Sequence, residues 1–112
     1  MNCEFMIASM PLPPCMPLPK AMLRLQVSNT AKVMYARLLD EILTRRTEDS
    51  NGILFICFSV MEIAAALSRS LQTCKRSLNE LKQAGMIMCV CQGIGEVSHM
   101  YILLPKEDAA HE

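Results

Sequence analysis

The sequence contains few aromatic residues, no tryptophan and no net charge. Aromatic residues make up only 4% of the 112 positions, whereas apolar residues make up 52%. That apolar content excludes a disordered chain, and we expect the ten methionines, with leucine, isoleucine and alanine, to fill the core. The length allows one domain, which excludes a multidomain enzyme. Eleven cationic and eleven anionic side chains balance each other, so nucleic-acid binding would require the cations to gather on one face.

The sequence also lacks a long hydrophobic run and a basic N-terminus. The longest apolar candidate, 52–61, is shorter than the roughly 20 residues that span a membrane. No lysine or arginine precedes Lys20, which argues against a secretory signal. Four of the six cysteines lie in apolar periodic segments, namely Cys57, Cys74, Cys89 and Cys91. This placement favours reduced thiols over a disulfide framework, and we expect a cytoplasmic protein with no membrane contact.

Motifs of the common enzyme classes are absent. The sequence contains no G-x-S-x-G, no H-E-x-x-H and no P-loop, and Gly93-Ile-Gly95 does not open a helix. Its two histidines suggest no general base. A zinc site at Cys89, Cys91 and His99 would lack a fourth ligand. We predict that the protein is not an enzyme and has no cofactor, no metal and no small-molecule substrate.

The first 19 residues differ from the rest of the chain. Met10-Pro-Leu-Pro13 recurs as Met16-Pro-Leu-Pro19, and proline at this density excludes helix and central strand. We predict an extended proline-rich N-terminal arm at 1–19, whose apolar side chains need cover from the domain body or from a second subunit. The domain itself is expected at 20–105, and a polar tail at 106–112.

Apolar spacing predicts two elements in the first half of the domain. Residues 20–25 form a helical turn, and Ser28 caps a helix whose apolar positions follow helical spacing: Ala31, Met34, Tyr35, Leu38, Leu39, Ile42 and Leu43. Residues 47–52 form a turn. The wholly apolar segment 53–58 is predicted to be a strand with little exposure.

The second half predicts two short helices and a hairpin. Ser59-x-x-Glu62 matches a capping box ahead of a helix at 60–67, and Ser68-Arg69 forms a break. Ser70 caps a helix at 71–83 with the apolar stripe Leu71, Cys74, Leu78 and Leu81, and Gly85 ends it. Strands at 86–91 and 98–104 flank a glycine-bearing loop at 92–97. The order predicts an α+β winged helix-turn-helix, with three helices and a small antiparallel sheet.

The helix at 71–83 carries the residues best suited to chemistry. Between 69 and 82 four cations face one anion, Glu80, which gives a net charge of +3. A major groove admits one helix, and arginine, asparagine, glutamine and threonine can read base edges there. The candidate DNA-binding residues are Arg69, Gln72, Thr73, Lys75, Arg76, Asn79 and Lys82. Such residues also occur on ordinary solvated helices, but the helix-turn-helix context favours DNA.

Two further regions bear on DNA contact. A second basic set would position the protein on phosphates, although it could equally serve solubility: Lys20, Arg24, Lys32, Arg37, Arg45 and Arg46. The hairpin loop offers Gln92 and Glu96, with His99 beside it, but no fixed cation. We interpret His99 as a strand residue rather than as a DNA contact.

Several motifs resemble one family. They are Met16-Pro-Leu-Pro-Lys20-Ala-Met-Leu23, the S-x-x-A-K-x-x-Y helix from Ser28 to Tyr35, and Leu78-x-x-Leu81-x-x-x-Gly85-Met-Ile87 before Gln92-Gly-x-Gly95. Over about residues 16–104 the chain resembles the N-terminal domain of replication initiator protein A, a family of plasmids and mobile elements of Gram-positive bacteria. The resemblance implies binding to repeated origin sites, as a dimer, through recognition helix 71–83. It makes Gln72, Thr73, Arg76 and Asn79 the base readers.

This sequence departs from the family in its acidic wing residue, its short loop after the first helix and its short length. Two alternatives therefore stay open. The chain could be a winged-helix transcriptional regulator, which would use the same contacts. It could also be a protein-interaction module whose DNA face is unused, which the proline-rich arm, the uncharged wing and the zero net charge favour.

Overall fold

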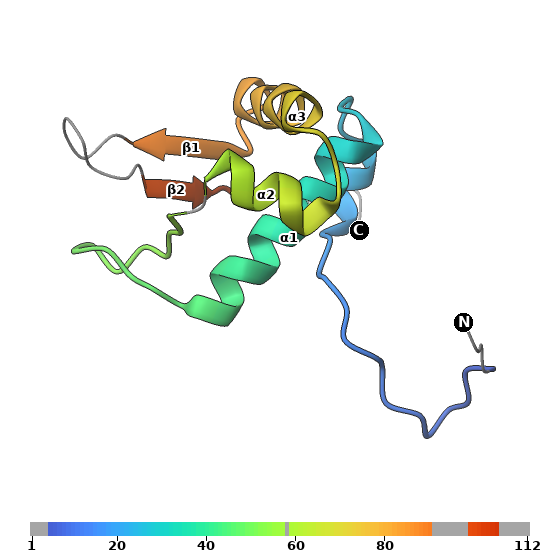
Figure 1. Cartoon of the computed structure of the whole chain (residues 1–112). Coiled ribbons are helices and arrows are strands. Elements are labelled where there is room, and N and C mark those ends of the chain that lie inside the picture. The colour runs from blue at the N-terminus through green and yellow to red at the C-terminus, as the bar shows by residue number, and fades with distance from the viewer. Residues whose placement is uncertain (1–4, 58, 91–98, 106–112) are drawn as a thin grey trace.

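Three helices and one hairpin make up the body of the protein. The computed structural model describes residues 5–57, 59–90 and 99–105. A 3-10 turn η1 (Lys20–Arg24) and three helices, α1 (Asn29–Arg45), α2 (Val60–Leu67) and α3 (Leu71–Gln83), precede the antiparallel strands β1 (Ile87–Val90) and β2 (His99–Ile102) (Figure 1). The α+β winged helix-turn-helix predicted from the sequence is confirmed, while the loop at 92–97 lies outside the described residues.

Serine caps start all three helices, as the sequence predicts. The hydroxyls of Ser28, Ser59 and Ser70 each accept a hydrogen bond from the backbone N–H three residues ahead, at 3.1–3.2 Å. These bonds satisfy N–H groups that have no partner inside the helix. Helix α3 ends as predicted at Gly85, whose φ of +78° favours glycine. The break between α2 and α3 is sharper than expected, because Ser68 also adopts a left-handed conformation, with φ of +53°.

The core lies between α1, α3 and one face of the hairpin. The largest fully buried side chain is Tyr35, which donates a hydrogen bond from its hydroxyl to the Leu103 carbonyl at 2.7 Å. Burial raises the pKa of this tyrosine to about 12. Methionine fills much of the remaining space, as predicted, through Met22, Met34 and Met100.

Two leucines predicted for the core are exposed. Leu71 is 42% exposed, because the first turn of α3 precedes its first buried residue, Cys74. Leu43 is 40% exposed in the last turn of α1. Cys89 is also exposed rather than buried, and Cys57 is half-buried. The spacing of apolar residues predicts which side of a helix or strand faces the core. It does not show how much of that side the neighbouring elements cover.

The hairpin turns one face to the helices and the other away. Ile87 pairs with Ile102, and Val90 pairs with His99. Because side chains alternate along a strand, Ile87 and Met100 lie on the buried face. Met88 and Tyr101 pair with each other on the opposite face. Met86, Leu103 and Leu104 lie outside the strands that were predicted to include them.

The predicted strand at 53–58 was wrong in its extent and exposure. Only Ile56 reaches the sheet, through paired backbone hydrogen bonds to Met100 at 3.0 and 2.8 Å. Upstream the chain folds back on itself, with bonds from Phe55 to Thr47 and from Asp49 to Ile53. Ile53 is 52% exposed. A strand needs a hydrogen-bonded neighbour along its length, and β2 pairs with this segment at Ile56 alone.

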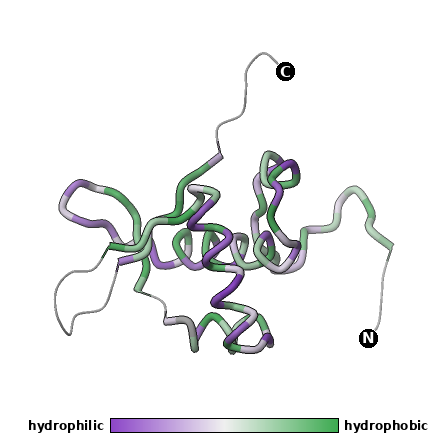
Figure 2. Tube along the Cα trace, turned by 90° about the horizontal axis from the view of Figure 1, so that it is seen from above, coloured by the Kyte–Doolittle hydropathy of each residue, from purple (hydrophilic) through white to green (hydrophobic). Residues whose placement is uncertain are grey.

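Residues 5–19, the described part of the segment before η1, contain no helix or strand. Residues 5–19 run away from the body (Figure 1), and Figure 2 shows apolar residues along them. Phe5 is 93% exposed and Leu12 is 69% exposed, so the domain body does not cover them.

Among the described helices none is long and apolar enough to cross a membrane.

Candidate nucleic-acid interface

Helix α3 has one buried side and one exposed polar side. Its buried residues are Cys74, Ser77, Leu78 and Leu81. The predicted base readers Gln72, Arg76 and Asn79 are exposed and follow one another at intervals of four and three residues. At 3.6 residues per turn this spacing places them in one stripe. Lys75 and Lys82 flank that stripe, and both are exposed.

These side chains are available to a ligand. In the described part of the chain, no hydrogen bond or ion pair engages the side chains of Arg69, Gln72, Lys75, Asn79 or Lys82. Arg69 lies in the turn before α3 and lines a cleft of about 170 Å³ with Asn29, Thr30, Val33 and Leu67. The turn therefore carries a cation next to the N-terminus of α1. We define the binding face of α3 as Arg69, Gln72, Lys75, Arg76, Asn79 and Lys82.

The one acid of α3 is bound to the residue that caps α1. The Glu80 carboxylate oxygen Oε2 accepts hydrogen bonds from the Ser28 backbone N–H at 2.9 Å and from the Ser28 hydroxyl at 2.8 Å. These two bonds, with a smaller contribution from Arg76, hold the pKa of Glu80 below its ordinary value of 4.5. The carboxylate thus joins α3 to the start of α1. Sequence reasoning counted Glu80 only as a charge, because its partner lies 52 residues away.

Thr73 is placed differently from the other predicted base readers. It is half-buried, and its hydroxyl accepts a hydrogen bond from the Ser70 hydroxyl at 2.8 Å. Its backbone N–H in turn donates to Ser70 at 3.1 Å. Thr73 therefore completes the cap of α3, and its role in base reading stays a prediction.

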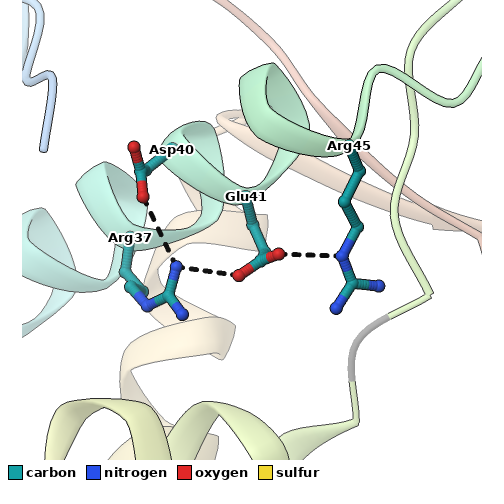
Figure 3. Close-up of polar contacts among 4 residues, drawn as sticks. All are labelled: Arg37, Asp40, Glu41 and Arg45. Carbon is teal, nitrogen blue, oxygen red and sulfur yellow. Dashed lines mark hydrogen bonds and ion pairs between the residues drawn. The ribbon is translucent and has the colours of Figure 1, made fainter.

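The second basic set is partly neutralised by acids of α1. Glu41 binds Arg37 at 2.9 Å and Arg45 at 2.8 Å, and Arg37 also lies 3.6 Å from Asp40 (Figure 3). Lys32 donates to the Leu23 carbonyl at 3.3 Å. Three of the six predicted phosphate contacts thus have partners within the protein. The other three, Lys20, Arg24 and Arg46, are exposed.

The described part of the hairpin contributes an aromatic cluster with Phe55. Gln92 and Glu96 lie outside the described residues. The ring of His99 stacks on Phe55, with centroids 3.9 Å apart and planes at 15°. This contact agrees with the interpretation of His99 as a strand residue. In the described ranges, no group of three His, Cys, Asp or Glu side chains is arranged to hold a metal ion.

Two short helices in a tight turn, an exposed polar second helix and a following β-hairpin define a winged helix-turn-helix domain. The family model for the replication initiator protein A (RepA) N-terminus matches residues 17–109. The chain belongs to this family. The resemblance inferred from the sequence motifs is therefore confirmed, including its approximate extent.

Solved structures share the fold at low sequence identity. One described as "N-Terminal domain of DNA binding protein" has a TM-score of 0.75 at 16% identity, covering 97% of this chain and 88% of that one. "Structure of Rep-DNA complex" has a TM-score of 0.74 at 17% identity, covering 85% and 78%. "Structure of MDR initiator" has a TM-score of 0.71 at 19% identity, covering 86% and 81%. No curated protein sequence matches the chain.

Proposed function

We propose that the protein binds double-stranded DNA sequence-specifically at the repeats of a plasmid or mobile-element replication origin, as a homodimer in the bacterial cytoplasm. The observation that carries this proposal is the binding face of α3, which is exposed and largely without partners while its one acid is held by Ser28. The family supports a role in replication initiation, and a solved structure of the same fold is described as a Rep–DNA complex. The role is binding rather than catalysis.

The binding face divides into readers and anchors. Arg76 has the donors to bind guanine through two hydrogen bonds, and Gln72 or Asn79 can do the same with adenine. Thr73 offers its methyl group to thymine. We assign Arg69, Lys75 and Lys82 to phosphates, because flexible cations at the edges of the stripe fix position without reading sequence.

A fluorescence-anisotropy titration tests this function. The probes are a duplex carrying the repeats of the replicon that encodes the chain and a scrambled duplex of equal length. We expect tighter binding to the repeats. If four to six phosphates are neutralised, the logarithm of the affinity falls with the logarithm of the salt concentration at a slope of roughly −4 to −5. An affinity that does not change with salt contradicts the proposal.

One observation favours a second function, that of a protein-interaction module. Large apolar side chains are exposed on the arm, the hairpin and α1. If neither duplex binds while the protein forms a stable assembly, the interaction module replaces the DNA binder. A transcriptional regulator would share the DNA contacts, and its protected site would lie at a promoter rather than at an origin.

A further inference from the structure

Two adjacent clefts form an apolar face on the hairpin and the end of α1. One, of about 300 Å³, lies between the 47–55 segment and the hairpin and includes Met88 and Leu103. The other, of about 230 Å³, includes Leu43 and Leu104, and both clefts share Ile53 and Ile102. We define the apolar face as Leu43, Ile53, Met88, Leu103 and Leu104, which are between 38% and 66% exposed. Side chains of this size usually mark an interaction site when they are contiguous.

The apolar face carries almost no charge. Among the described residues, Asp49 is the one charged side chain that lines either cleft. Its carboxylate already accepts hydrogen bonds from the backbone N–H groups of Asn51 and Ile53 at 2.8 and 3.0 Å, and from the Tyr101 hydroxyl at 2.9 Å. These bonds hold the pKa of Asp49 below its ordinary value, the bond from Ile53 most strongly. The clefts therefore suit an uncharged apolar occupant.

The N-terminal arm has the matching chemistry. Residues 5–19 contain no charged side chain, and their large apolar residues are exposed except Met10, which is half-buried. The two Met-Pro-Leu-Pro units begin at Met10 and Met16, six residues apart. In a polyproline II helix, which has three residues per turn, both units would present the same side, roughly 19 Å apart. Such a segment is already extended and loses little entropy when it binds.

We propose that the arm of one copy occupies the apolar face of a second copy, and that each copy gives and receives one arm. This inference rests on the homodimer of the proposed function. The arm leaves the body on the side opposite the 47–55 segment (Figure 1), which favours the face of a second copy over its own. The exchange makes two identical contacts related by a twofold axis. Helix α3 lies on the other side of the sheet from the 47–55 segment (Figure 1), so the binding faces stay open to DNA.

Sedimentation equilibrium of full-length variants tests the exchange. Leu12→Asp with Leu18→Asp puts two charges on the arm side chains that would enter the clefts, and Ile53→Asp with Leu104→Asp puts two on the apolar face. All four positions are exposed, so the fold should survive, which circular dichroism checks. We expect either pair to raise the dimer dissociation constant by about tenfold or more, because a carboxylate would be buried without a partner. Mixing the two variants restores one intact contact and partial association.

Matched controls carry the same charge elsewhere. Ala8→Asp with Ser9→Asp changes the arm outside its repeats, and Leu23→Asp with Met61→Asp changes exposed apolar positions away from the apolar face. Both controls should associate like the unmodified chain. A monomeric unmodified chain, controls that dissociate equally, or an arm effect that the apolar-face variant does not share each overturns the proposal.

A duplex with a single repeat separates this inference from the DNA-binding proposal. The arm and apolar-face variants should bind one repeat as the unmodified chain does, because α3 is unchanged. If no chain binds DNA but association still requires both arm and apolar face, the function fails and the exchange stands. If the single-repeat affinity falls with the arm variant, the arm contacts DNA and the exchange is wrong.

Discussion

Helices α1 and α3 both carry several cations, but they use them in opposite ways. On α1, Arg37 and Arg45 share the carboxylate of Glu41. On α3, Glu80 is held by Ser28, and the neighbouring cations stay exposed. Helix α1 also supplies much of the core, whereas α3 buries only one side. From this difference we expect the partners of a charge, rather than the number of charges, to decide which helix can bind a polyanion.

Shortening a core side chain of α1 should give the largest effect. Leu38 is fully buried, and Leu38→Ala should lower the free energy of unfolding by about 2–5 kcal/mol, because a cavity remains. Urea unfolding measures it. DNA affinity per folded molecule should not change, since α1 is structural. A loss of affinity in fully folded protein would mean that the packing of α1 against α3 positions the binding face.

Removing one arginine from each helix should give the clearest difference in DNA affinity between α1 and α3. Arg76→Ala should weaken repeat binding by about 1–3 kcal/mol and relax the preference for one base pair. Arg37→Ala is the matched control on α1, and its affinity should stay close to that of the unmodified chain, because Arg37 already has carboxylate partners. Fluorescence-anisotropy titrations with a panel of repeats that differ at single base pairs measure both the affinity and the base-pair preference. An equal loss on every sequence would reassign Arg76 to phosphate contact.

The contact between the two helices should depend on pH. The pKa of Glu80 is lowered by its bonds to Ser28, so its contribution is present above about pH 4.5 and is lost as the pH falls through the folded-state pKa. Glu80→Gln should therefore lower the free energy of unfolding at pH 7 by roughly 0.5–1 kcal/mol, the size of an exposed hydrogen bond. The difference should shrink as the pH falls below about 4.5 and Glu80 becomes protonated.

Ser28→Ala is the companion variant, and it should remove the same dependence on pH. If Glu80→Gln is as stable as the unmodified chain at pH 7, the link contributes nothing measurable. If the two unfolding curves stay parallel down to pH 3, another group carries the effect.

Local features of this fold could be predicted, whereas contacts between distant segments could not. The caps at Ser28, Ser59 and Ser70 and the glycine at Gly85 act within one turn, so sequence spacing reveals them. The bond between Glu80 and Ser28 joins segments 52 residues apart, and no local pattern signals it.

The partial failure at 53–58 and the position of Thr73, whose role in base reading stays a prediction, have the same cause. The segment 53–58 has strand-forming residues, but a strand also depends on its neighbour. Within 53–57, Ile56 alone pairs with the hairpin, while Leu54 pairs with Glu48 in a separate bridge. Thr73 has the chemistry of a base reader, but the Ser70 hydroxyl already uses its oxygen. Residue type therefore indicates what a side chain can bind, and packing decides what it does bind.

The smallest predicted effect would make α1 resemble α3. Glu41→Gln removes the carboxylate that binds both Arg37 and Arg45, and exposed pairs of this kind contribute about 0.3–0.5 kcal/mol each. Stability should fall slightly. Affinity for scrambled DNA at low salt should rise, because the Glu41 carboxylate no longer competes with phosphates for Arg37 and Arg45. The difference in affinity between the repeats and scrambled DNA should therefore become smaller. The control is Glu62→Gln, which changes an exposed acid on α2 that makes no described ion pair, and it should leave this difference nearly unchanged. If both variants behave alike, overall charge governs DNA binding, and the partners of individual cations do not.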